Sequence, residues 1–542
     1  MRATVLSFTC SLVVSALAAG AEAPAATKAE EQRLGPLHEK ILLWRTPRDG
    51  RRLAYVAAKE GKCLVVVDGQ PGPVCDGIAP GTLRFSPDGR HFGYVAAKGK
   101  KRVVVADGQE GPEYDGILER NPFFSPDGAH VAYAAQKGDK WVMVLDGKEG
   151  DAFDAVMRDM PVFSPDGKRI AYAAKRGKKW SVTVDGQPGQ AFDAVQEGAP
   201  FFSPDGTRLA YGAQQGGKWV VVVDGQAGPP VDALLAGSPL FSSDSKRVAY
   251  AAQRGKRFVV FLDGQAGPEL HAIAEGSPVF SPDGRRLAYC GSRDNQHHVF
   301  LDGKPGPAFD ALGRGDPVFS PDGNRVAYSA LKGAKWAVVL DGRPGPSLDA
   351  IMDRTPVFSP DSKRVAYGAR RGEKWLVVLD GVPGPPWDGI VAGTPVFSPD
   401  SQHIAYGARN GDAWLVVADG KPGPEFGGVG EGTLAFSPDG ARLVHVGGRA
   451  TKKLVVVDGT PGPEFDHIVP PVFSPDGRHL AYRAKRGAKG GARSLIVLDG
   501  QPGPAYDGVI PNGPAWLPDG AVEYLAHRDK VLYRVRQAPP SR

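Results

Sequence analysis

The sequence is poor in the residues and motifs that carry most enzyme and redox chemistry. Its 542 residues include only four cysteines, and its 11 histidines are scattered along the chain. It has no G-x-S-x-G elbow, no H-E-x-x-H pair, no C-x-x-C pair and no EF-hand loop. These absences exclude the common signatures of serine hydrolases, zinc proteases, thioredoxin-like proteins and calcium sensors. The composition therefore favours a protein that is not an enzyme.

Long hydrophobic runs are also missing, except near the first residue. Arg2 precedes an apolar stretch over Val5–Ala19, and small residues follow over 19–23. This order of basic, apolar and small residues is typical of a secretory signal peptide. The apolar stretch is shorter than a bilayer requires, so a membrane anchor is the weaker alternative. We expect a signal peptide over 1–23, a polar linker without structure over 24–34, and export to the periplasm or the cell exterior.

Three cysteines remain in the expected mature chain. Cys63 and Cys75 both lie six residues from Gly69, the middle of a predicted hairpin, so they face each other across two antiparallel strands. Directly opposite residues have Cβ atoms about 4.5–5.5 Å apart, slightly wide for a disulfide but adjustable. Because an exported compartment permits oxidation, we predict a structural disulfide between Cys63 and Cys75. Cys290 stands where the repeat usually has Ala or Gly, and is predicted to be a buried small residue.

Glycine and proline, by contrast, are abundant, with 72 and 49 residues. They recur with a strict period, because the turn sequence FSPDG and its variants return at steps of 39 residues. A period of 20 to 50 residues indicates an array, a solenoid or a propeller. The copies begin at Phe85, Phe124, Phe163, Phe202, Phe241, Phe280, Phe319, Phe358, Phe397 and Phe436, with less regular copies at Thr46, Phe473 and Trp516.

Each period is predicted to contain four short strands. In the copy at Phe163 these are Pro161–Ser164, Arg169–Ala174, Trp180–Val184 and Ala191–Val195. SPDG and DGQPG supply the turns, since Asp-Gly is the strongest short-range hairpin signal. Four antiparallel strands in about 40 residues are typical of one blade of a β-propeller. The sequence therefore predicts an all-β fold of about 13 blades.

Thirteen blades exceed the 4 to 8 of a typical ring. We therefore expect two propellers in tandem, over 35–279 and 280–536, followed by a tail over 537–542. A single very large ring is the alternative, and the constant period across the division favours it. Gly35–Ile41 resembles a fourth strand, so the two ends of the repeat region are expected to share one blade.

The motif FSPDG-x-R-[LVI]-A-Y resembles the WD40-like β-propeller repeat family. It resembles in particular the Pro-Asp variant found in the propeller domain of TolB-type periplasmic proteins. The motif covers residues 46–524, and the resemblance is confined to the propeller. It implies an exported scaffold that binds another macromolecule.

Aspartate recurs at three positions of the repeat, as in Asp166, Asp185 and Asp193. A catalytic carboxylate is normally unique, so this repetition indicates a structural role, in which Asp accepts backbone N–H bonds within turns. Calcium held between adjacent turns is the alternative; otherwise no cofactor is expected. Recurring Tyr, Trp and Phe residues are predicted to form layers between blades, with stacking on a ligand as the alternative.

Positive charge gathers in the turns between the second and third strands. In the twelve complete repeats these turns hold 30 Lys and Arg and five acidic residues, although the whole chain is only +6. They lie on one face of the ring, so we expect a strongly dipolar protein whose basic rim binds an acidic protein or an anionic envelope polymer. Nucleic acid is less suited to an exported chain, and plain solvation of exposed turns is the alternative. The predicted basic rim comprises Lys100, Lys101, Arg102, Lys175, Arg176, Lys178, Lys179, Arg254, Lys256, Arg257, Arg370, Arg371, Lys374, Lys485 and Arg486.

An enzyme or a small-ligand binder with its site in the central channel is the alternative function, and an inert envelope protein is a third. Such a site would be made of residues that break the repeat, and it requires them to meet at one mouth of the channel. If they are spread over the ring, the binding scaffold is favoured. The breaks are Ser243, Ser245, His271, Asn295–His298, Gly427–Gly428 and the insert Lys485–Arg493.

Overall fold

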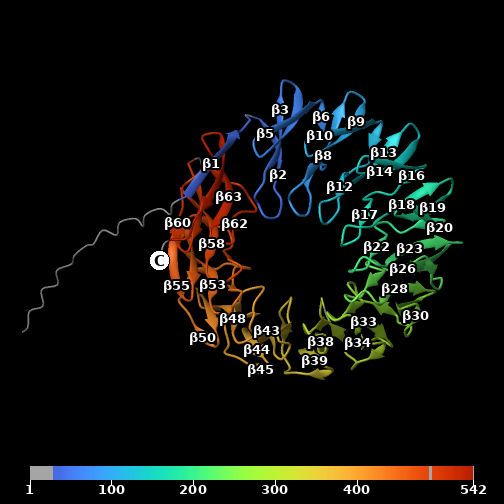
Figure 1. Cartoon of the computed structure of the whole chain (residues 1–542). Coiled ribbons are helices and arrows are strands. Elements are labelled where there is room, and N and C mark those ends of the chain that lie inside the picture. The colour runs from blue at the N-terminus through green and yellow to red at the C-terminus, as the bar shows by residue number, and fades with distance from the viewer. Residues whose placement is uncertain (1–28, 39, 316, 488–490, 541–542) are drawn as a thin grey trace, which may run out of the picture.

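The computed structural model describes residues 29–38, 40–315, 317–487 and 491–540. Within these ranges every regular element is a β-strand, and the strands form thirteen separate antiparallel sheets. The sheets stand side by side around a wide central opening (Figure 1). The predicted propeller of thirteen blades is therefore confirmed. The expected signal peptide over 1–23 lies outside the described residues.

The fourth blade shows how one repeat folds. Its innermost strand is in two pieces, β16 (Ala155–Val156) and β17 (Val162–Phe163), which both pair with β18 (Ile170–Arg176). The strands β19 (Lys179–Val184) and β20 (Gln187–Phe192) follow outward. The fourth strand is expected over 191–195, but the observed strand β20 ends at Phe192. Ala194 and Val195 form β21 (Ala194–Val195), which belongs to the next sheet.

The second and third strands of the other blades repeat this pattern. The second strands are β3 (Ala54–Lys59), β8 (Phe92–Lys98), β13 (Val131–Lys137), β23 (Leu209–Gln215), β28 (Val248–Arg254), β33 (Leu287–Arg293), β38 (Val326–Lys332), β43 (Val365–Arg371), β48 (Ile404–Asn410), β53 (Leu443–Arg449), β58 (Leu480–Arg486) and β63 (Val522–Arg528). The third strands are β4 (Lys62–Val67), β9 (Lys101–Ala106), β14 (Lys140–Leu145), β24 (Lys218–Val223), β29 (Arg257–Leu262), β34 (Gln296–Leu301), β39 (Lys335–Leu340), β44 (Lys374–Leu379), β49 (Ala413–Ala418), β54 (Lys452–Val457), β59 (Arg493–Leu498) and β64 (Val531–Gln537).

The expectation of two propellers in tandem is wrong, because all thirteen blades belong to one ring (Figure 1). The expected division after residue 279 falls within β32 (Val279–Phe280), inside the seventh blade. Val260 of the sixth blade and Tyr289 of the seventh share one buried cluster, as neighbours do elsewhere in the ring. Val182 and Tyr211 occupy the equivalent positions between the fourth and fifth blades, so the chain passes the expected division without a change in packing.

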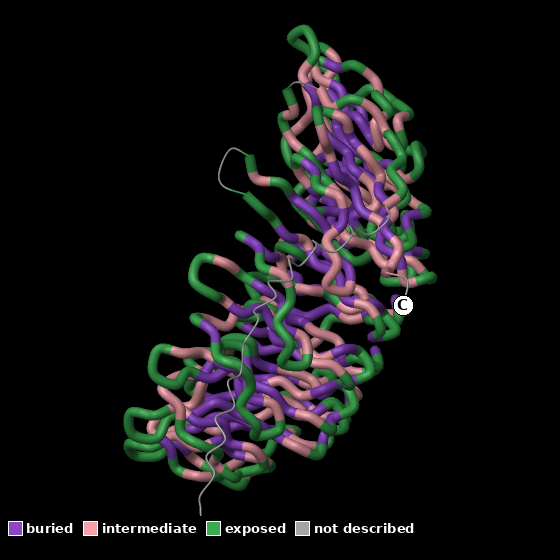
Figure 2. The backbone as a smooth tube through the Cα atoms, turned by 90° about the vertical axis from the view of Figure 1, so that its left-hand side faces the viewer, coloured by how far each residue is buried: buried purple, intermediate pink, exposed green. Residues whose placement is uncertain are grey.

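Buried residues run through the middle of the blades, and exposed residues lie at the turns (Figure 2). The predicted aromatic layers lie between blades. Phe192, at the end of one outer strand, packs edge-on against Tyr211 of the next blade, with ring centroids 6.2 Å apart. Phe153 and Tyr172 repeat this contact at 5.9 Å. Edge-to-face aromatic pairs add stability beyond the apolar area they bury, which helps to hold successive blades together.

The ring is closed by β1 (Ala29–Pro36), which pairs with β64 as the outermost strand of the thirteenth blade. Figure 1 shows β1, drawn in blue, beside the red strands of this blade. The prediction that the two ends share one blade is right, but the strand is 29–36 and not 35–41. The linker expected over 24–34 is accordingly part of a strand from residue 29.

Polar and apolar contacts fix this closure. The hydroxyl of Tyr506 donates to Glu31 Oε1 at 2.7 Å, and Arg528 Nη2 donates to Glu31 Oε2 at 2.7 Å. Burial alone raises the pKa of Glu31. The hydrogen bonds from Tyr506 and Arg528 together lower that pKa by more than burial raises it, so the net shift is downward. Leu53 of the first blade packs with Leu525 of the thirteenth in a buried cluster. The ring is thus continuous across the junction.

The two cysteines of the first blade stand opposite each other, as predicted, but the predicted disulfide is not formed. Cys63 pairs with Cys75 in the register of β4 and β5 (Gln70–Cys75), and both thiols are free. The thiol of Cys75 donates to the carbonyl oxygen of Cys63 at 3.4 Å. The equivalent residues Trp219 and Val231 exchange both backbone hydrogen bonds, and such pairs hold their side chains farther apart than the other pairs of an antiparallel ladder. Cys290 is buried, as predicted.

Removal of β1 is expected to destabilise the ring. A chain that begins at residue 37 loses the β64 ladder and leaves Arg528 and Tyr506 without Glu31. We expect the melting temperature to fall by about 5 °C or more. The matched control is a chain that begins at residue 29 and keeps the whole strand. Equal melting curves for the two chains would contradict the closure.

Candidate functional site: the two faces of the ring

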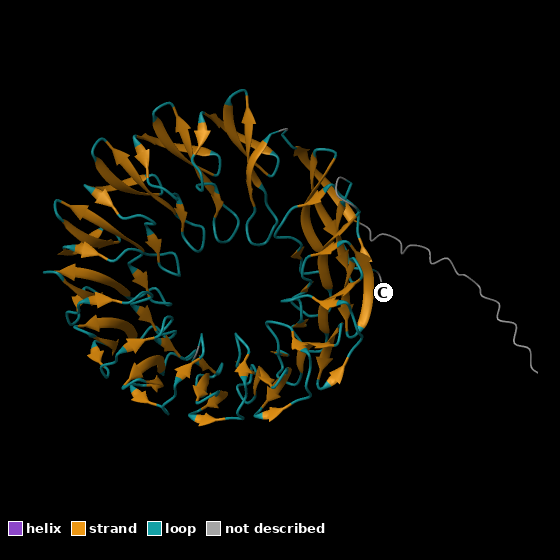
Figure 3. Ribbon diagram, turned by 180° about the vertical axis from the view of Figure 1, so that it is seen from behind, coloured by secondary structure: helices purple, strands orange, loops and turns teal. Residues whose placement is uncertain are grey.

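Each blade presents different turns at its two ends. In the fourth blade the turns Ser164–Arg169 and Asp185–Gly186 lie at one end, whereas Gly177–Lys178 and the link Asp193 lie at the other. This follows because successive antiparallel strands reverse direction. We call the first set, with its equivalents, the hairpin face and the second set the basic face. Loops at the inner ends of the blades face the central opening (Figure 3).

On the hairpin face, one aspartate joins neighbouring strands and blades. Asp185 has φ 50°, the left-handed conformation that the first position of an Asp-Gly hairpin requires. Its carboxylate accepts from Ile170 N at 2.9 Å and from Arg169 Nε at 3.0 Å. Arg169 Nη1 also donates to Thr207 O of the next blade at 3.0 Å, and the guanidinium lies 5.4 Å from the Phe202 ring centroid. The pair therefore links each blade to the following one.

The SPDG aspartates are bonded within their own turns. Asp205 Oδ1 accepts from Ser203 Oγ at 2.6 Å and from Thr207 N at 3.0 Å. These bonds, led by the Ser203 hydroxyl, lower the pKa of Asp205 to about 2. The same hydroxyl accepts from Arg208 N at 3.0 Å, so one serine and one aspartate close the turn between the first and second strands.

On the basic face, the link aspartates neutralise part of the positive charge. Asp193 Oδ2 accepts from Gly216 N of the next blade at 2.8 Å, and Oδ1 pairs with Lys179 Nζ at 2.5 Å. The hydrogen bond from Lys179 and then that from Gly216 lower the pKa of Asp193. The same pairing joins Lys62–Asp76, Lys101–Asp115, Lys140–Asp154, Lys218–Asp232, Lys335–Asp349, Lys374–Asp388, Lys452–Asp466 and Arg493–Asp507.

This placement reduces the predicted dipole. The basic turns alone sum to +25, but ten link aspartates lie on the same face and bring the sum to +15. Sequence reasoning assigned these aspartates to the fourth strand and overlooked their side of the ring. The sequence does contain a sign of the pairing between these aspartates and the basic turns. In two blades His271 and Gly427 replace the link aspartate. At Gly427 the paired positions also change, to Ala413 and Ala450.

The predicted basic rim divides into engaged and available side chains. Lys101, Lys179 and Lys374 pair with link aspartates. Arg176 pairs with Asp151 at 2.6 Å and, like Arg254 and Arg486, lies over a Phe ring. Lys175 lies over Trp180, and Arg102 donates to a backbone carbonyl. Among the described residues, no carboxylate lies within the 4.0 Å ion-pair distance of the remaining members: Lys100, Lys178, Lys256, Arg257, Arg370, Arg371 and Lys485.

The residues that break the repeat do not meet. Ser243 and Ser245 lie in a turn of the hairpin face in the sixth blade, whereas His271 and Asn295–His298 lie on the basic face in the seventh. Gly427–Gly428 and the described ends of the 485–493 insert lie in the eleventh and twelfth blades. His298 Nδ1 is 2.9 Å from Gly306 O, and His297 is its strand neighbour, so their side chains point to opposite sides of the sheet. Among the described residues, no three His, Cys, Asp or Glu side chains form a metal-binding group.

The turn aspartates make the fold sensitive to acid. A carboxylate whose pKa is lower in the folded state contributes stability that is present above its unfolded pKa and is lost as pH falls through the folded pKa. With the unfolded value near 4 and the Asp205 value at about 2, we expect the melting temperature to fall between pH 4 and pH 2. Thermal melts at constant ionic strength measure this. A melting temperature that is flat across this window would show that these hydrogen bonds do not stabilise the ring.

Asp193→Ala is expected to lower the melting temperature by about 1–3 °C, because Gly216 N and Lys179 lose their acceptor. Asp193→Asn is the matched control, since it keeps an acceptor for Gly216 N and removes only the charge. We expect it to lie between wild type and Asp193→Ala. If Asn and Ala cost the same, the backbone bond to Gly216 contributes nothing.

Comparison with known proteins assigns no family to the chain. No protein-family model and no curated protein matches the chain. Among the described residues, no helix is long and apolar enough to cross a membrane. Solved structures that resemble the chain include a eukaryotic initiation factor, with 16% identity over 58% of this chain and 90% of the other, at a TM-score of 0.31. The propeller domain of the Trilobed protease from Pyrococcus furiosus matches with 14% identity over 50% and 94% of the two chains, at 0.23. TolB from Acinetobacter baumannii matches with 14% identity over 48% and 77%, at 0.22. The assignment of the fold rests on the thirteen blades of the chain itself.

Proposed function

We propose that the ring is an exported, non-catalytic scaffold of the Pro-Asp WD40-like type, and that it binds an acidic protein or an anionic envelope polymer through its basic face. The observation that supports this most directly is the set of exposed cations without a carboxylate partner. They include Lys100, Lys178, Lys256 and Arg371, which belong to the second, fourth, sixth and ninth blades. In this proposal the ring needs no cofactor.

The spacing of these cations defines the kind of partner. Single exposed charges interact weakly in water, and salt screens them further. Several of them around one rim attract a partner that is long or wide enough to contact more than one blade at a time. An acidic polymer or a broad acidic protein surface meets this requirement, whereas a small anion does not.

The residues that break the repeat support a scaffold over a channel enzyme. They are spread over the sixth, seventh, eleventh and twelfth blades and over both faces. A catalytic site needs its groups within hydrogen-bond reach of one substrate. No second function is therefore favoured by a specific observation.

The test is binding to heparin, used as a model polyanion, at increasing salt. The variant Lys100→Glu/Lys178→Glu/Lys256→Glu/Arg371→Glu reverses four exposed cations of the basic face that have no structural partner. We expect heparin affinity to fall with salt in the wild type, and to fall by about tenfold or more in this variant. Fluorescence anisotropy with labelled heparin measures both effects.

A charge-matched control separates location from net charge. Lys168→Glu/Lys246→Glu/Arg285→Glu/Lys363→Glu makes the same change in net charge on exposed positions of the hairpin face. We expect it to retain affinity within about twofold. If both variants lose affinity equally, or if neither does, the basic face is not the binding surface.

A further inference from the structure

A groove opens on the hairpin face at the interface between successive blades. Five such grooves occur at equivalent positions, with volumes from about 370 to 580 Å³. Each is lined by third- and fourth-strand residues of one blade and by the second-strand tyrosine of the next. In four of them the tyrosine hydroxyl is buried and has no hydrogen-bond partner in the part of the chain that the structure describes; these are Tyr250, Tyr289, Tyr367 and Tyr482.

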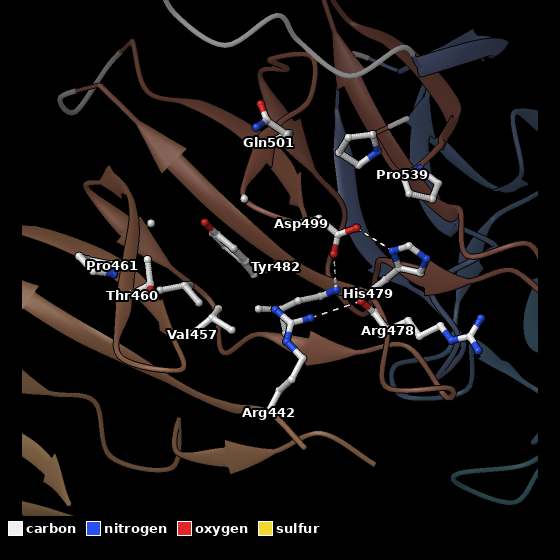
Figure 4. A pocket seen from close by; sticks show the side chains of 15 residues that line it. Arg442, Val457, Thr460, Pro461, Arg478, His479, Tyr482, Asp499, Gln501 and Pro539 are labelled. Atoms are coloured by element: carbon white, nitrogen blue, oxygen red, sulfur yellow. Dashed lines mark hydrogen bonds and ion pairs between the residues drawn. The ribbon is translucent and has the colours of Figure 1, made fainter. Parts of the chain in front are cut away.

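The groove between the eleventh and twelfth blades differs from the others (Figure 4). It is the largest of the five, at about 580 Å³, and Pro539 and Pro540 close one side of it. It also lies between the two blades across which the period shortens, since Phe473 follows Phe436 after 37 residues instead of 39. The difference in groove size therefore coincides with a difference in sequence.

Arg442 is held more loosely here than its equivalents are elsewhere. Its Nε lies 3.6 Å from Asp458 Oδ2, whereas the seven equivalent Arg–Asp pairs lie at 2.8–3.2 Å. Its Nη1 donates to Arg478 O at 3.3 Å. The guanidinium keeps further N–H groups that can bind a ligand.

Donors are available in this groove, while its one carboxylate is occupied. Asp499 accepts from the His479 ring at 2.6 Å and from Leu480 N at 2.8 Å. The Tyr482 side chain is 2% exposed, and its hydroxyl has no partner among the described residues. Burial raises the pKa of Tyr482, so the phenol stays protonated and can donate. Gln501 adds an amide at the opening.

From these contacts we propose that the groove between the eleventh and twelfth blades binds a small organic carboxylate with an apolar body. The carboxylate accepts from the Arg442 guanidinium and the Tyr482 hydroxyl, a charge-assisted arrangement that arginine favours. The apolar body packs against Val455, Val457 and Pro539. This site lies on the hairpin face and is independent of the proposed basic-face partner, so either can fail without the other.

The test is calorimetric titration of the full mature chain with 4-phenylbutyrate, and with the uncharged 4-phenylbutyramide as the matched ligand. We expect the carboxylate to bind about tenfold more tightly than the amide. Tyr482→Phe is expected to weaken carboxylate binding by about tenfold. It should leave the melting temperature unchanged, because the hydroxyl that it removes has no partner in the free protein.

Tyr250→Phe is the matched control, since it removes the equivalent buried hydroxyl from the groove between the fifth and sixth blades. It should bind the carboxylate within about twofold of wild type. A chain that ends at Gln537 removes the proline wall without touching a strand, and it should weaken binding severalfold even if Tyr482→Phe folds poorly. Absence of binding, equal binding of the amide, or equal losses in the two tyrosine variants would overturn the proposal.

Discussion

The ring depends on one carboxylate in each of the first twelve blades, at the left-handed first position of the Asp-Gly hairpin between the third and fourth strands. Because Asp185 closes a tight turn with φ 50°, its side chain is directed back to the start of the second strand, where it accepts from Ile170 N and Arg169. Arg169 then reaches a carbonyl oxygen in the next blade. In four blades a histidine takes the place of the arginine and keeps the contact with the aspartate; these are His91, His130, His403 and His479.

The number of blades follows from the sameness of their interfaces. Most blades contact the next through an Arg–Asp or His–Asp pair on the hairpin face and a link aspartate on the basic face. An aromatic pair such as Phe192–Tyr211 joins several of them. A repeat protein of this kind is nearly one-dimensional, since each unit packs only on its neighbours. Each blade is therefore rotated by a similar small angle relative to the one before it, until the thirteenth blade packs against the first. The contact between Leu53 and Leu525 completes this circuit.

The period of 39 residues was sufficient to predict the blades, the strand types and the structural role of the aspartates. It was also sufficient to place Cys63 opposite Cys75, because an Asp-Gly hairpin fixes the register. The size of the ring was not predictable in this way, since the angle between blades depends on how side chains such as Phe192 and Tyr211 fit. The absence of the disulfide was not predictable either, because it depends on whether the two cysteines form a hydrogen-bonded pair of the ladder, whose side chains lie farther apart, or a non-hydrogen-bonded pair. The closing strand was misplaced because Glu31 stands in a sequence without the repeat motif, and its partners Tyr506 and Arg528 are distant in the chain.

The position of β1 has a consequence for assembly. The strand over 29–36 precedes all the other blades in the chain, and its partner over 531–537 follows them, so both edges stay unpaired until the ring closes. An unpaired strand edge readily accepts a strand from another chain. Among concentrated folding chains, we expect β1 of one copy to be able to complete the thirteenth blade of a neighbour, which would yield strand-exchanged rings. The balance between closed single rings and linked ones should then depend on how fast the chain is produced.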